Sequence, residues 1–191
     1  MRHMIVCEIN LSDIFIPETF LLNSYKRGII SVYTTENGSK RLQGFKDGIK
    51  NIKNARIVAM ISISSNAQSA TAGSRKLLEE NPEINVLVGF NEWSTLGVGT
   101  AIKELGVKDS VCGRGCDNYS EGVGLLETGE RDSLFVQNPF SMGYLAVMNA
   151  ANILSGKKTE HEIKTDVYVV DRSNMFSADV QKILFGFDKY K

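Results

Sequence analysis

Four polar side chains with complementary hydrogen-bonding chemistry follow strand-like, apolar runs of this sequence. They are Arg41, Asn91, Asp117 and Gln137. A guanidinium group only donates hydrogen bonds, a carboxylate only accepts them, and an amide does both. Each hydroxyl of a polyhydroxylated ligand can both donate and accept, so this set suits a sugar-like molecule. An unpaired buried partner is costly, which would make such a site specific.

The same residue types also have ordinary structural roles. Asp, Asn and Ser that follow strands often cap helices, and residues such as Asn66, Asp117 or Ser39, taken singly, are more often caps than ligand contacts. Glu92 suits the first turn of a helix, where an acidic side chain is favourable. Arg41 lies near the start of a predicted helix, where a cation is mildly unfavourable, and this slightly favours a functional role for it.

Other chemistries have less support in the sequence. The glycine-rich stretch around Gly113 and Gly122 lacks the spacing of a dinucleotide-binding or phosphate-binding loop, and no Gly-x-Ser-x-Gly elbow occurs. With only two histidines, His3 and His161, a Ser–His or Cys–His nucleophile pair is unsupported. The three cysteines form neither a disulfide framework nor a metal-binding spacing. We therefore expect no enzyme activity, no cofactor and no metal.

The overall composition is that of a globular protein without a strongly charged surface. Of the 191 residues, 42% are apolar, and 22 basic residues balance 22 acidic ones. This balance does not indicate a nucleic-acid partner. No apolar run is long enough to span a bilayer, and the opening residues lack the apolar core of a signal peptide.

Apolar strand-like runs alternate with helical patterns along most of the chain. This alternation predicts an α/β fold with an open parallel sheet flanked by helices in three layers, whose strands end on one shared edge. On that edge the four polar side chains would converge. Residues 34–38 are expected to form a turn, with Ser39 capping the helix that follows and Gly28 ending the helix before it. We expect strands at 29–33, 56–61, 84–88, 111–113, 133–136 and 165–170, with a short strand possible at 5–7, and helices at 17–25, 39–53, 67–80, 92–105, 119–126, 141–154 and 178–185.

Several segments together resemble a known family. They are Arg41-Leu-Gln-Gly-Phe45, Leu77-Leu-x-x-Asn-Pro82, Phe90-Asn-Glu with Leu96-Gly97, Cys116-Asp117 and Val136-Gln-Asn-Pro-x-x-Met-Gly-Tyr144. In order and spacing they resemble the type I periplasmic binding proteins, in particular the ribose- and galactose-type sugar receptors of bacterial ABC importers, over residues 17–176. The resemblance implies that Arg41, Asn91, Asp117 and Gln137 contact a sugar. It also implies a periplasmic or cell-surface location, and an ABC permease or a chemoreceptor as partner. Where the family often has an aromatic ring, this chain has Ser64 and Ser65.

Members of that family have two lobes, and this chain resembles the carboxyl-terminal one. The resemblance divides the chain into an irregular segment (1–16), a sugar-binding lobe (17–136) and a hinge crossover with one helix of the other lobe and a terminal strand (137–191). Most of the amino-terminal lobe has no counterpart, so the sequence is expected to be truncated relative to the family. The helix at 141–154 would then need another cover, which predicts a homodimer or repacking through its apolar stripe. The leading hypothesis is a sugar-binding module of a transport or chemosensory system. The alternatives are the effector-binding half of a lactose-repressor-like regulator and a receptor remnant that binds nothing.

Overall fold

Strands and helices alternate along the chain, as the apolar pattern predicts. The computed structural model describes residues 4–5, 26–31, 35–52, 54–117 and 120–185. The expected helix at 17–25 lies outside the described residues. The strands are β1 (Met4–Ile5), β2 (Lys26–Ser31), β3 (Arg56–Ser62), β4 (Val86–Gly89), β5 (Cys112–Cys116), β6 (Ser133–Gln137), β7 (Glu162–Ile163) and β8 (Val167–Asp171). The helices are α1 (Glu36–Ile49), α2 (Ala67–Glu80), α3 (Glu92–Leu105), α4 (Ser120–Glu127), α5 (Pro139–Leu154) and α6 (Ala178–Leu184).

Six of the strands form one open sheet in the order β3-β2-β4-β5-β6-β8. The first five are parallel to their neighbours, which confirms the predicted parallel sheet. The edge strand β8 differs, because it pairs with β6 in the antiparallel direction, with Leu134 opposite Val170. The sheet is therefore mixed. Its parallel strands all end on the same edge.

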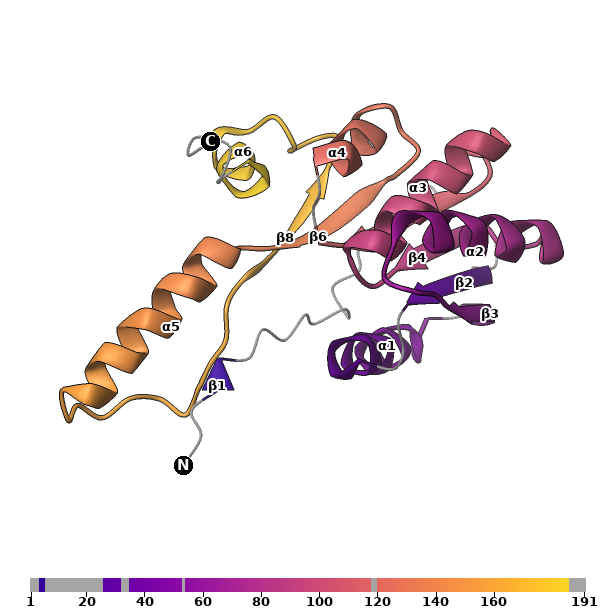
Figure 1. The fold of residues 1–191 in the computed structure, drawn as a ribbon. Helices are drawn as coiled ribbons and strands as arrows, with labels where there is room; N and C mark the ends of the chain where they lie inside the picture. Colours follow the sequence, from indigo (N-terminus) through magenta and orange to yellow (C-terminus); the bar gives the residue numbers. More distant parts are fainter. Residues whose placement is uncertain (1–3, 6–25, 32–34, 53, 118–119, 186–191) are drawn as a thin grey trace.

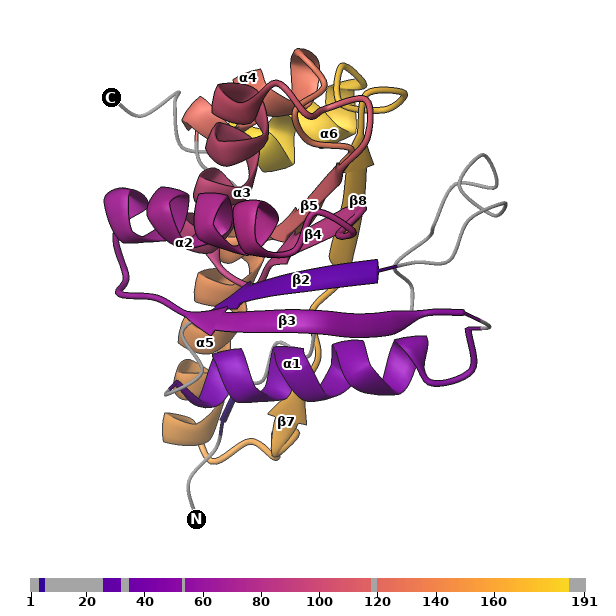
Figure 2. The same ribbon diagram turned by 90° about the vertical axis from the view of Figure 1, so that its right-hand side faces the viewer.

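Helices cover both faces of this sheet. In Figure 1, α1 lies below β2 and β3, whereas α2, α3 and α4 lie on the opposite face. Figure 2 shows α1 running beside β3 on that lower face, with α2 and α3 on the other side of the strands. The molecule thus has the expected three layers of helix, sheet and helix.

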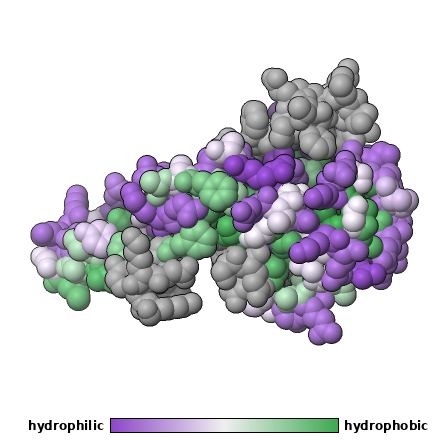
Figure 3. All heavy atoms as spheres, turned by 90° about the horizontal axis from the view of Figure 1, so that it is seen from above, coloured by the Kyte–Doolittle hydropathy of each residue, from purple (hydrophilic) through white to green (hydrophobic). Residues whose placement is uncertain are grey.

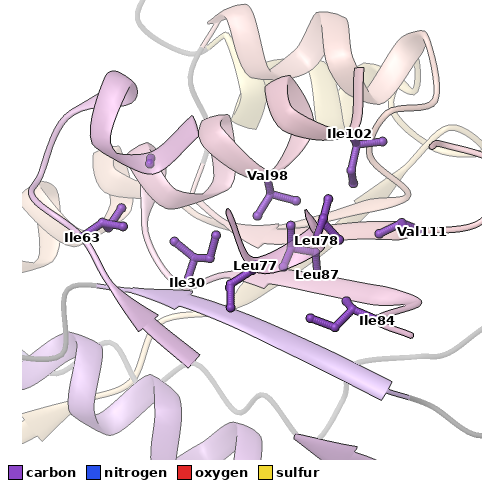
Figure 4. Packing of buried hydrophobic residues seen from close by; sticks show 10 residues of the cluster. Ile30, Ile63, Leu77, Leu78, Ile84, Leu87, Val98, Ile102 and Val111 are labelled. Atoms are coloured by element: carbon purple, nitrogen blue, oxygen red, sulfur yellow. The ribbon is translucent and has the colours of Figure 1, made fainter. Parts of the chain in front are cut away.

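The central strand β4 is buried on both faces and separates two apolar clusters. Val86 and Val88 face the cluster under α1, which contains Phe45. Leu87 faces the opposite cluster, and Figure 4 shows it surrounded by side chains of α2, α3 and the neighbouring strands. Burial on both faces explains why β4 is a continuous apolar run rather than an alternating one.

The start of α1 differs from the sequence prediction. The helix begins at Glu36 because the Thr35 hydroxyl accepts a hydrogen bond from the Gly38 backbone N–H at 3.1 Å. The predicted turn at 34–38 and the predicted Ser39 cap are therefore wrong: Thr35 is an equally good capping residue four positions earlier. The inner face of the helix carries Phe45, which is buried, and Leu42 and Ile49, which pack beside it.

Gly28 was predicted to end a helix. This is wrong, because the residue lies inside β2. A Cβ atom at this position would lie 2.8 Å from Leu87 Cδ1 and 2.9 Å from Ile84 Cδ1. A side chain at this position would make the ends of Leu87 and Ile84 shift, so Gly28 allows close packing onto the strand, a role that local sequence alone does not show.

Helix α5 projects away from the three-layer body as an arm (Figure 1). None of its residues is buried. Next to the arm, β1 and β7 form a separate two-stranded parallel sheet, in which Ile5 pairs with Ile163. In the view of Figure 3, hydrophobic surface gathers on this arm. Its largest exposed apolar side chains are Phe140, Tyr144, Val147, Met148, Ile153 and Leu154.

Candidate functional site

Arg41 and Asp117 form an ion pair at the carboxyl edge of the sheet. Arg41 Nη1 donates to Asp117 Oδ2 at 2.7 Å, and Arg41 Nη2 donates to Asp117 Oδ1 at 3.1 Å. Arg41 Nη1 also donates to the backbone carbonyl of Phe90, just past the end of β4. The pair is only partly open to solvent, since the side chains are 11% and 28% exposed. A two-pronged contact of this kind fixes the orientation of both groups.

The backbone around Asp117 supports this geometry. Asp117 has a left-handed conformation with φ of 69°, which aspartate tolerates better than most residues. Its backbone N–H donates to the Phe135 carbonyl of β6 at 2.9 Å. Asp117 thus links the ends of three neighbouring strands, through Phe90 by way of Arg41 and through Phe135 directly.

Asn91 lies between β4 and α3 and caps that helix. Its side-chain oxygen accepts from the Ser94 backbone N–H at 2.9 Å and from the Ser94 hydroxyl at 2.6 Å. In return, Ser94 Oγ accepts from the Asn91 backbone N–H at 2.9 Å, which completes a capping box. Asn91 therefore has the helix-capping role that is common for such residues. Its amide nitrogen is the part of the side chain that the cap does not use.

Close packing sets the start of α3 against the strand ends. The buried Thr95 hydroxyl donates to the Cys116 carbonyl at 2.8 Å, next to Asp117. A Cβ atom on Gly115 would lie 2.1 Å from Thr95 Cγ2, and one on Gly89 would lie 2.5 Å from the Thr95 backbone nitrogen. Glycine in β4 and β5 therefore allows α3 to approach the sheet closely.

Gln137 ends β6 and is half-buried. It lies two residues beyond Phe135, whose carbonyl accepts from Asp117, so it shares the edge of the sheet with the ion pair. Asn138, which follows it, caps α5 by accepting from the Ser141 backbone N–H at 3.1 Å. Asn66 caps α2 in the same way, accepting from the Ser69 backbone N–H at 2.8 Å. These two amides therefore have the capping role.

The electrostatics differ between the edge and the strand interior. Burial, together with the negative charge of Asp117, raises the pKa of Glu92 above its usual range. Burial raises the pKa of Cys112 and of Cys116 to about 12, so both thiols stay protonated near neutral pH. Both cysteines are buried and free, as expected of residues that form neither a disulfide framework nor a metal site.

The structure brings Arg41 and Asp117 into direct contact and sets Asn91 and Gln137 on the same edge. The predicted position of Arg41 near a helix start is wrong: because α1 begins at Glu36, Arg41 lies in its second turn. Sequence reasoning also missed the Phe90 carbonyl and the Thr95 hydroxyl. The small residues Gly89 and Gly115, which face Thr95, were the signal that could have indicated the close approach.

Other kinds of site find little support in the described part of the chain. No group of three or more His, Cys, Asp or Glu side chains there could hold a metal ion. An open groove between α2 and α3 is lined by residues such as Gln68, Arg75 and Glu104, and none of the four predicted site residues lines it. Among the helices described, none has the length and apolar character needed to cross a membrane.

Comparisons with known proteins give a consistent picture. The chain is 28% identical over 136 residues to a D-ribose/D-allose-binding protein of Pseudomonas aeruginosa, a match that covers 71% of this chain and 42% of the relative. It is 26% identical to a ribose import binding protein of Haemophilus influenzae, covering 71% of this chain and 46% of that protein. The chain thus spans less than half the length of these curated relatives.

Solved structures show the same likeness in three dimensions. A carbohydrate transporter solute-binding protein from Agrobacterium radiobacter, in complex with D-arabinose, superposes with a TM-score of 0.77 at 28% identity, covering 84% of this chain and 55% of that one. An ABC transporter solute-binding protein from Agrobacterium vitis with bound D-fucose gives a TM-score of 0.78 at 26% identity, covering 86% and 57%. These matches confirm the predicted fold class.

The family assignment follows from the extent of the sequence match. The pattern of the periplasmic binding protein domain matches residues 26–158, which run from β2 to just beyond α5. The match includes all four predicted site residues. By this match the chain belongs to the periplasmic binding protein domain family.

Proposed function

We propose that this chain binds a sugar through the carboxyl edge of its sheet, as one lobe of a solute-binding receptor. The observation that supports this most directly is the Arg41–Asp117 pair, which holds a carboxylate in a fixed orientation at that edge. The lone pairs of Asp117 that the guanidinium leaves free can accept from sugar hydroxyls. Asn91 Nδ2 and the Gln137 amide supply donors beside it. The relatives named above are sugar-binding proteins, and they do not favour the transcription-regulator alternative.

The same proposal extends to partners and location. The similar protein from Agrobacterium vitis is named as an ABC transporter solute-binding protein, so an ABC permease is the proposed membrane partner, with a chemoreceptor as the alternative. The periplasm or the cell surface is the compartment in which such a receptor would work. Binding, rather than catalysis, is the proposed activity of this edge.

Calorimetric titration tests the proposal. The sugars to use are those bound by the named relatives, namely ribose, allose, arabinose and fucose. Saturable binding is expected from the chain, with a loss of at least about tenfold in Asp117→Ala because a charge-assisted contact is worth more than 1.4 kcal/mol. Asp109→Ala is the matched control, since Asp109 is an exposed aspartate in the loop before β5. Flat traces from the folded chain with every sugar would contradict binding by this chain.

A further inference from the structure

The cation at the carboxyl edge is already engaged by the protein. Arg41 Nη1 donates to the Phe90 carbonyl and to Asp117, and Nη2 donates to the other oxygen of Asp117. The positive charge of Arg41 is thus balanced by one carboxylate within the protein, and few of its donors remain for a ligand. Any further carboxylate at this edge leaves the site with a net negative charge.

Glu92 is such a carboxylate. It is the first residue of α3 and directly follows the cap Asn91. The register of β4 and β5, in which Gly89 pairs with Gly115, sets the residues just after β4 beside Asp117. Arg41 bridges the same two strand ends through Phe90 and Asp117. Glu92 therefore lies at the edge that holds the proposed sugar site.

The surroundings of Glu92 differ from those of three other helical acids in this chain. Glu36, Glu79 and Glu104 are each paired with a lysine or an arginine on the surface. Glu92 is half-buried, and no ion-pair partner for it is found among the described residues. A first-turn acid that served only the helix dipole should have a lowered pKa. The pKa of Glu92 is instead raised, by burial and by Asp117.

We infer that Glu92 is a further ligand-contacting residue, and that it makes the site prefer neutral and cationic sugars over anionic ones. This inference rests on the proposed sugar-binding function. With all three groups ionised, Arg41, Asp117 and Glu92 together carry a net charge of −1, in a place that water only partly reaches. Sugar hydroxyls and the ammonium group of an amino sugar donate to such a surface, whereas the carboxylate of a sugar acid is repelled.

Three sugars that share the galactose ring but differ in charge test this selectivity. Galactose, galactosamine and galacturonate are titrated into the chain at pH 7, and galactosamine is expected to bind more tightly than galactose, which binds more tightly than galacturonate. Glu92→Gln should reduce the galactosamine-to-galactose affinity ratio about threefold, the size expected of a partly exposed charge pair, and improve galacturonate relative to galactose. Glu83→Gln, at an exposed acid before β4, makes the same change in charge away from this edge and should leave both ratios unchanged.

The outcomes separate this inference from the function on which it rests. If galactose binds and Glu92→Gln leaves both ratios as they are, Glu92 does not contact the ligand and the binding function stands. If no sugar binds the folded chain, the function and the inference both fail.

A measurement without ligand adds an independent check. The Glu92 carboxyl should titrate above its ordinary pKa by carbon-13 NMR and return toward it in Asp117→Asn. An ordinary value in the unmodified chain would overturn the inference.

Discussion

At the scale of single residues, Arg41 and Asp117 join elements that lie far apart in the sequence. Arg41 belongs to α1, and Asp117 follows β5 on the far side of β2 and β4. Both side chains are shielded enough for their contact to matter, at 11% and 28% exposed. Their pairing therefore stabilises the fold as well as orienting the proposed binding group.

This arrangement predicts coupled effects on stability. Arg41→Met and Asp117→Asn should each lower the free energy of unfolding by about 1–2 kcal/mol, because each leaves a partly buried polar partner without its charge-assisted bonds. The double variant should cost clearly less than the sum of the two, which urea unfolding of all four proteins would measure. Simple additivity would show that the two side chains do not interact in solution.

Residue types and spacing predicted which side chains gather at the edge of the sheet, but not the hydrogen bonds that these side chains form. Arg41 and Asp117 were expected to face a ligand, and nothing in the local sequence shows that they also bind each other across 76 positions. Asn91 was likewise read as a contact, and its oxygen serves a capping box. Such pairings depend on tertiary distances, which strand order sets and which a single sequence does not give. The sugar contacts of these residues remain predictions.

At the scale of elements, the seating of α3 on the strand ends depends on two positions without side chains. Gly89 and Gly115 make room for Thr95, whose hydroxyl also bonds the Cys116 carbonyl. The helix bounds themselves were predictable: α2 and α3 begin and end where the apolar period and the caps indicate. The two glycines could indicate a close approach, but not that Thr95 is the partner, because the contact joins parts of the chain about 20 residues apart.

Gly115→Ala should therefore destabilise the chain by about 2 kcal/mol or more, since the new methyl group would overlap Thr95. Gly124→Ala is the control, because a Cβ atom there meets nothing within 4 Å and the residue is exposed on α4. That change should be neutral or stabilise by up to about 1 kcal/mol through helix propensity. Thermal and urea unfolding measure both variants, and equal stability of the two would contradict the packing described for α3.

The burial of Arg131 between α3 and α4 was not predicted from the sequence. Arg131 is 1% exposed, and its guanidinium lies against α3 and α4, where a Cβ atom on Gly99 or Gly122 would come within 2.8 Å of it. Burial lowers its pKa to about 10. A cation just before a strand ordinarily indicates a solvent-facing position. Here, tertiary packing overrides that expectation.

At the scale of the whole molecule, the three-layer body buries its apolar side chains, whereas the arm leaves many of its own exposed. The body encloses its apolar clusters, whereas α5 leaves Val147 70% exposed and Leu154 89% exposed. The apolar stripe on this helix was predicted from the sequence, and the resemblance to a two-lobed family implied that it needs another cover, by a homodimer or by repacking. The two-stranded sheet of β1 and β7 beside the arm was not predicted, because such short strands have no recognisable period.

We expect the arm to associate with a second copy of the chain, since a large exposed apolar patch is unfavourable in water. Sedimentation velocity over a range of concentrations should show dimers that Val147→Lys together with Leu154→Lys weaken about tenfold or more. Gln68→Lys adds a single positive charge on an exposed position of α2 and should leave association unchanged. A monomer at every concentration would show that α5 is not covered by a second copy of the chain.

The join between body and arm has a mechanical consequence. Gln137 ends β6 and Pro139 begins α5, so a single residue, Asn138, separates the proposed binding edge from a 16-residue rigid rod. Pro139 restricts its own backbone torsion, and the Asn138 cap holds the first turn. A small rotation at Gln137 is therefore amplified along the rod into a much larger sweep of its far end. A sugar that contacts Gln137 would therefore bind at the pivot of this motion.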